Sequence, residues 1–84
     1  MITGAQIRMA RGYLRWSVRE LSEACGVSVA TIKRMEDEDG MPNSFANNLS
    51  AIRQALESAG IEFVHDGPYS GDGGPGVRLR KDKP

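Results

Sequence analysis

The side chains most able to recognise another molecule lie close together in residues 28–34. Arginine and lysine donate hydrogen bonds to guanine acceptors in the DNA major groove, and small apolar side chains can contact the thymine methyl group. Arg34 is the leading candidate, because its planar guanidinium matches two acceptors of guanine. The candidate base-reading residues are Ser28, Val29, Ala30, Lys33 and Arg34. The alternative is that these side chains only form a solvated surface.

Residues that could hold a DNA phosphate lie mostly on either side of this segment. Ser17 is placed to begin a helix, where the free amides and the helix dipole favour an anion. Ser17 can equally be a helix cap and nothing more. A phosphate contact fixes the register of a protein on DNA and carries no sequence information. The candidate phosphate contacts are Arg15, Ser17, Arg19, Thr31, Asn43 and Asn47.

The charged residues are unevenly distributed along the chain. With 11 Lys+Arg and 11 Asp+Glu, the formal net charge is zero. Residues 1–35 nevertheless hold six cations and two anions, whereas residues 36–66 hold one cation and seven anions. A basic first part suits a polyanionic partner such as DNA despite the neutral total. A solvated surface of mixed charge is the alternative interpretation.

Three helix N-termini follow one another in the first half of the chain. A hydroxyl residue followed three positions later by Gln or Glu forms a capping box, and Thr3 with Gln6 and Ser17 with Glu20 have this spacing. Ser28 begins a third such signal, with Thr at the later position. Together with the spacing of the apolar residues, these signals predict helices near residues 3–13, 17–25 and 28–37.

The second half predicts a fourth helix and then a change of pattern. Apolar residues recur every three or four positions and predict a helix that Gly60 ends, through Phe45, Leu49, Ile52, Leu56 and Ala59. Residues 61–64 and 77–80 are typical of short strands, and residues 66–76 between them have the composition of a loop. We therefore expect a mainly α protein of four helices with a short C-terminal two-stranded β element.

Several classes of protein are disfavoured by the composition. A chain of 84 residues has room for one small domain, in which a large enclosed active site is improbable. Cys25 is the single cysteine and His65 the single histidine, so we expect no disulfide, no metal and no cofactor. The sequence has no apolar run of membrane-spanning length and no secretory signal pattern at Met1. We expect a cytoplasmic protein that is not an enzyme.

The most specific pattern surrounds the turn between the second and third predicted helices. Gly26 suits the turn, the small Ser22 suits a close helix crossing, and apolar residues at Leu21, Val27, Ile32 and Met35 can join the two helices. With a helix on each side, residues 3–60 resemble the Xre/Cro/cI family of helix-turn-helix transcriptional regulators, whose DNA-binding domain is lambda-repressor-like.

The resemblance implies how the chain is organised. Residues 1–60 would be a helix-turn-helix DNA-binding domain, residues 61–80 C-terminal strands that could serve dimerisation, and residues 81–84 a tail. It also implies a partly buried ion pair between Arg11 and Glu36. The chain departs from the family pattern at three positions: Val18 and Val29 stand where many members have Gln, and Glu38 where they have Gly.

The resemblance implies a homodimeric repressor that reads an inverted-repeat operator in double-stranded DNA with the helix near residues 28–37. The alternative is a protein-binding antiactivator or antitoxin-like module that keeps the fold without specific DNA binding. The acidic residues 36–66 would then be the surface for a protein partner. A small factor that bends DNA in recombination is a third interpretation. None of the three involves a membrane.

Overall fold

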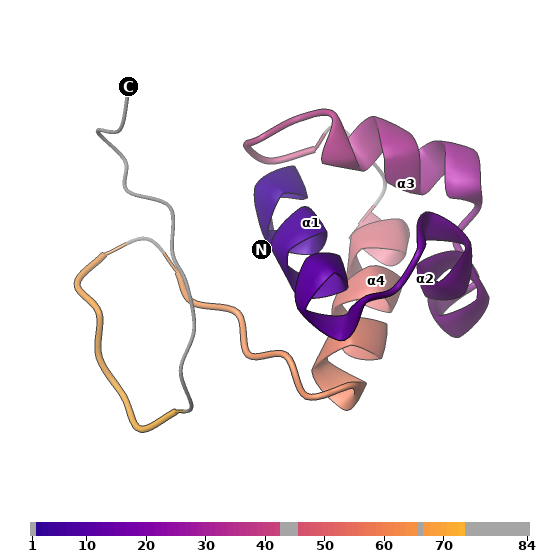
Figure 1. The fold of residues 1–84 in the computed structure, drawn as a ribbon. Helices are drawn as coiled ribbons and strands as arrows, with labels where there is room; N and C mark the ends of the chain where they lie inside the picture. Colours follow the sequence, from indigo (N-terminus) through magenta and orange to yellow (C-terminus); the bar gives the residue numbers. More distant parts are fainter. Residues whose placement is uncertain (1, 43–45, 66, 74–84) are drawn as a thin grey trace.

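The computed structural model describes residues 2–42, 46–65 and 67–73. Within these ranges the chain forms four helices and no strand. They are α1 (Gly4–Leu14), α2 (Val18–Cys25), α3 (Val29–Glu36) and α4 (Ala46–Ser58). Helix α2 packs against both α3 and α4, and α1 packs against α3. Figure 1 shows residues 61–65 and 67–73 on the side of the bundle away from α2 and α3.

The helices begin where the capping signals predicted. Thr3 and Ser17 each accept a hydrogen bond from the amide of the third helical residue, at 3.1 Å and 3.0 Å. The side-chain oxygens of Gln6 and Glu20 in turn accept a hydrogen bond from the backbone amides of Thr3 and Ser17, which completes both capping boxes. Ser28 caps α3 in the same way through its hydroxyl, at 3.2 Å. Because each cap satisfies an amide that the helix cannot, it stabilises its helix by about 1 kcal/mol.

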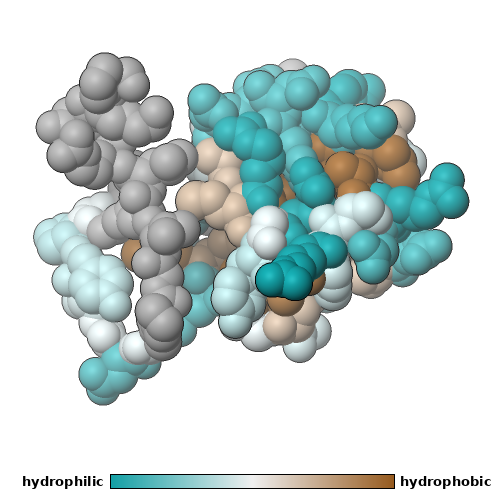
Figure 2. All heavy atoms as spheres, in the orientation of Figure 1, coloured by the Kyte–Doolittle hydropathy of each residue, from teal (hydrophilic) through white to brown (hydrophobic). Residues whose placement is uncertain are grey.

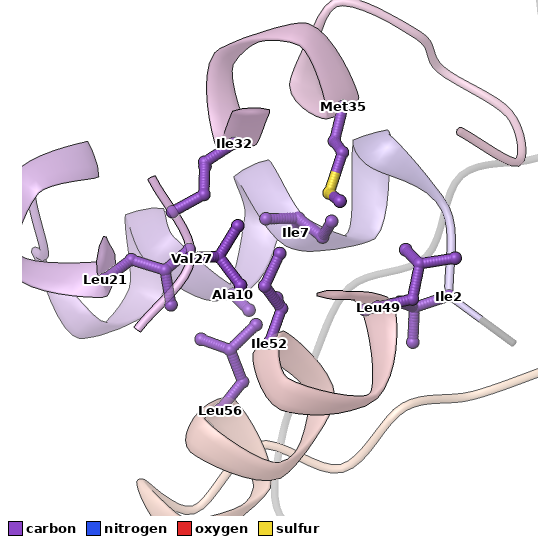
Figure 3. Packing of buried hydrophobic residues seen from close by; sticks show 10 residues of the cluster. All are labelled: Ile2, Ile7, Ala10, Leu21, Val27, Ile32, Met35, Leu49, Ile52 and Leu56. Atoms are coloured by element: carbon purple, nitrogen blue, oxygen red, sulfur yellow. The ribbon is translucent and has the colours of Figure 1, made fainter. Parts of the chain in front are cut away.

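The four helices enclose one apolar core, while hydrophilic residues dominate the outside of the bundle on the face in Figure 2. Figure 3 shows Ile7 of α1 lying between Met35 of α3 and Ile52 of α4. Most core residues are those whose spacing predicted an inward face. The buried cluster is Ile2, Ile7, Ala10, Leu21, Val27, Ile32, Met35, Leu49, Ile52 and Leu56.

The segment after α4 packs on the bundle without forming a strand in the described residues. Ile61 and Phe63 lie against the core, and the guanidinium of Arg53 stands over the Phe63 ring, 5.9 Å from its centroid. The side-chain amide of Gln6 donates to the Val64 carbonyl at 3.0 Å. The second predicted strand, residues 77–80, and the tail lie outside the described residues. The two-stranded element therefore stays a prediction.

Gly4 permits an unusually close approach between α1 and the end of α3. Its amide donates to the Gly40 carbonyl at 3.0 Å. A Cβ atom at Gly4 would lie 1.9 Å from the carbonyl oxygen of Glu38 and 2.2 Å from that of Met35. These are backbone atoms, so no side-chain rotation can make room. The contact is not evident from the sequence, because a glycine near a helix start also occurs where no second backbone comes close.

We predict that Gly4→Ala lowers the free energy of unfolding by about 2–3 kcal/mol, because the new methyl group must push two helices apart. Gly12→Ala is the matched control: it lies in the same helix, and its added Cβ would meet nothing within 4 Å. That variant should be neutral or more stable by up to about 1 kcal/mol. Denaturant unfolding followed by circular dichroism measures both, and equal stabilities would contradict the close contact.

Candidate nucleic-acid interface

The turn between α2 and α3 is fixed by hydrogen bonds back to α2. Gly26 adopts a φ of +79°, in the left-handed region that favours glycine, and its amide donates to the Ser22 carbonyl at 2.8 Å. The Ser22 hydroxyl donates to the carbonyl of buried Val27 at 2.6 Å. The sequence suggested that the small side chain of Ser22 lets α2 and α3 cross closely. The structure adds that its hydroxyl satisfies a carbonyl of the turn.

Helix α3 presents its polar side outward and its apolar side to the core. Ile32 and Met35 are buried, as predicted. Of the five candidate base-reading residues, Val29 is half-buried and the other four are exposed: Ser28, Ala30, Lys33 and Arg34. Figure 2 shows mainly hydrophilic residues along the upper side of the molecule, where Figure 1 places α3 and the loop after it. The described residues after α4 leave this face of α3 uncovered.

The candidate phosphate contacts lie in three places. Arg15, Ser17 and Arg19 are exposed around the start of α2. Thr31 is half-buried on α3, and Asn47 is exposed in the first turn of α4. Asn43 lies outside the described residues. Because Ser17 exchanges hydrogen bonds with Glu20, its role as a cap is established. At this end of α2, the guanidinium groups of Arg15 and Arg19 are the cations that could hold a phosphate.

Arg15 has an uncommon backbone conformation. It is the C-cap of α1 with a φ of +58°, and it is the one non-glycine residue with positive φ in the described ranges. Glycine is favoured at such positions, because the left-handed region brings Cβ close to the backbone. The Arg15 amide still donates to the Gly12 carbonyl at 3.2 Å, which helps to end the helix. Thus α1 ends on a residue that is less stable there than glycine.

The predicted ion pair between Arg11 and Glu36 is present. The guanidinium donates to both carboxylate oxygens, at 2.9 Å through Nε and 2.8 Å through Nη2. Arg11 also donates to the Trp16 carbonyl at 3.0 Å. The hydrogen bonds that Arg11 donates to Glu36 are the main cause that raises the pKa of Arg11, against the opposing effect of burial. The Glu36 side chain is 8% exposed, so this pair joins α1 to α3 inside the fold.

A second arginine of α1, for which the sequence suggested no role, also holds the end of α3. Arg8 donates to the Glu36 carbonyl and to the carboxylate of Asp39 in the following loop. Arg8 precedes Arg11 by three positions, so both lie on one side of α1. The three-residue spacing from Arg11 is the sequence feature that could have indicated this role of Arg8. Of the six cations in residues 1–35, two therefore hold the fold together, and four remain near α2 and α3: Arg15, Arg19, Lys33 and Arg34.

A shallow hollow between α2 and α4 has a volume of about 520 Å³ and an uncharged lining. It is lined by Trp16, Ala24, Cys25, Ala51, Gln54, Ala55, Ser58 and Ala59. Trp16 packs against the core, in keeping with a structural role.

In the described part of the chain, no three His, Cys, Asp or Glu residues are grouped to hold a metal ion. No helix there is long and apolar enough to cross a membrane.

No protein-family model, curated protein or solved structure matches this chain.

We predict that Glu36→Ala lowers the free energy of unfolding by about 2–3 kcal/mol, because it leaves the partly buried Arg11 without its counter-charge. The double variant R11M/E36L removes both charges and should recover most of that loss. As a control, Arg53→Ala disrupts the exposed pair with Glu57 on α4, where we expect about 0.5 kcal/mol or less. Glu36→Ala as mild as Arg53→Ala would contradict the structural role of the pair.

Proposed function

We propose that the protein is a sequence-specific DNA-binding transcriptional regulator that reads the major groove with α3. The observation that carries this proposal is the outward face of α3. It displays two cations beside small polar and apolar side chains, and no described segment covers it. An α-helix fits the major groove, where such side chains can contact base edges. The inner face of the same helix is anchored in the core, so the outer face is held rigidly.

The roles of the individual residues follow from their chemistry. Arg34 would pair with O6 and N7 of a guanine, and Lys33 would reach a guanine or a phosphate. Ala30 and the exposed part of Val29 would contact thymine methyl groups. Arg15 and Arg19, around the start of α2, would hold phosphates and so fix the register of α3 in the groove.

The arrangement of α2, the short turn and α3 supports placing the chain among lambda-repressor-like helix-turn-helix proteins of the Xre/Cro/cI type. Such a unit commonly acts as a symmetric dimer, with two recognition helices about 34 Å apart in successive major grooves. We propose a homodimer that represses transcription from an inverted-repeat operator. The C-terminal residues 61–80 are the proposed dimer contact.

The proposal is tested by selecting bound duplexes from a random-sequence DNA pool and measuring the affinity of the selected duplex at several salt concentrations. We expect an inverted repeat with about 10 base pairs between half-site centres. The logarithm of the affinity should fall with that of salt, with a slope of about −0.9 per neutralised phosphate. No duplex binding even at low salt would overturn the proposal and favour the protein-binding alternative.

Two variants that each remove one arginine provide the matched control for this experiment. Arg34→Ala removes the proposed guanine contact and should reduce the preference for the selected duplex over a scrambled one. Arg53→Ala removes a cation from α4, where it pairs with Glu57 and covers Phe63, and should leave this preference unchanged. Equal effects of the two variants would show that the preference follows total charge and does not depend on α3.

We also predict that Arg15→Gly makes the fold more stable and DNA binding weaker. Glycine relieves the positive φ, and we expect a gain of about 0.5–1 kcal/mol in the free energy of unfolding. Loss of the cation should weaken binding similarly on all duplexes and lower the salt slope by about 0.9 per protomer. Arg15→Ala is the control: it should weaken binding equally without stabilising the fold. Unchanged DNA binding in both variants would exclude Arg15 as a phosphate contact.

A further inference from the structure

We infer that Thr31 is a positioning residue that holds the guanidinium of Arg34 ready for base reading. This inference rests on the proposed function and deepens it. It assigns part of the sequence selectivity to a residue that itself contacts no base. The structural basis is a chain of hydrogen bonds along the exposed side of α3, from Ser28 through Thr31 to Arg34.

The chain of hydrogen bonds begins at a fixed point. Ser28 is the N-cap of α3, and its hydroxyl accepts a hydrogen bond from the Thr31 amide at 3.2 Å. The same hydroxyl donates to Thr31 Oγ1 at 2.9 Å. Thr31 is β-branched, so its side chain has few accessible rotamers in a helix. It is also half-buried, which restrains it further. The Thr31 hydroxyl is therefore held in place from both the cap and its own backbone.

Arg34 Nη2 donates to this fixed hydroxyl at 3.3 Å. An exposed arginine otherwise samples many rotamers, and ordering its side chain on binding opposes affinity. One hydrogen bond to Thr31 restricts that freedom in the free protein. It uses only one of the five N–H donors of the guanidinium, so other donors remain for O6 and N7 of guanine. Thr31 thus restrains Arg34 while leaving most of its donors available to a base.

This role differs from the phosphate contact that the sequence suggested for Thr31. In the structure, Thr31 Oγ1 accepts hydrogen bonds from both Ser28 and Arg34, and its O–H stays free to donate, so binding measurements have to separate the two roles. A phosphate contact carries no sequence information, so its loss weakens binding to every duplex alike. Loss of a positioning residue weakens binding only where Arg34 reads its base. The two roles therefore give different results in one experiment.

The experiment compares wild type, Thr31→Val, Thr31→Ser, Arg34→Ala and the double variant T31V/R34A. The probes are the duplex that wild type selects from a random pool, a set in which each guanine is replaced by 7-deazaguanine, and a scrambled duplex. We expect Thr31→Val to reduce the preference for the selected over the scrambled duplex by about threefold to tenfold. Thr31→Ser keeps the hydroxyl and should restore most of the preference. Adding Thr31→Val to Arg34→Ala should change nothing further.

Each result bears on the inference. The guanine whose 7-deaza replacement weakens wild type but not Arg34→Ala identifies the base that Arg34 reads. Wild-type preference in Thr31→Val, or an equal loss in the Arg34→Ala background, overturns the positioning role and leaves the proposed function standing. An equal loss of affinity on all duplexes assigns Thr31 to a phosphate instead. If wild type selects no duplex, the proposed function and this inference fall together. Thermal unfolding of Thr31→Val checks that the fold is intact.

Discussion

The contact between α1 and the C-terminal end of α3 is the constraint on which the rest of the structure depends. The backbones meet at Gly4, where a single Cβ atom would overlap two carbonyl oxygens. Arg8 and Arg11 then bind the last turn of α3 and the loop after it. Because α3 is held from its inner side and its C-terminal end, its outer face needs no contact with the rest of the chain. Rigidity and exposure of this face thus have the same origin.

Tertiary contact is also what keeps α3 helical. A helix of eight residues is too short to be stable alone in water, because the cost of nucleation exceeds the gain from so few hydrogen bonds. Ile32 and Met35 supply the missing free energy by burying their side chains in the core. The cap at Ser28 adds a local contribution. The proposed DNA-reading surface therefore exists only while the four-helix core is intact.

The distribution of charge explains how a chain of zero net charge can place two exposed cations, Lys33 and Arg34, on the outer face of α3. Part of the acidic segment is neutralised internally, since Glu36 binds Arg11 and Asp39 binds Arg8. Within each pair the two opposite charges largely offset each other. The exposed cations that remain lie around α2 and α3, and the exposed anions Glu20 and Glu23 also belong to α2. The net charge of the whole chain therefore does not describe the charge of the outer face of α3.

The sequence by itself determined the features that depend on neighbouring residues. Capping signals fixed the starts of α1, α2 and α3, and apolar spacing identified most of the core, because both act over a few positions along one helix. Tertiary structure decided the close approach at Gly4, the role of Arg8 and the pairing of Thr31 with Arg34. The first two join residues that are far apart in the sequence, and the third needs side-chain positions that spacing does not specify. Arg15 belongs with these, because its positive φ follows from the path between two packed helices and not from its residue type.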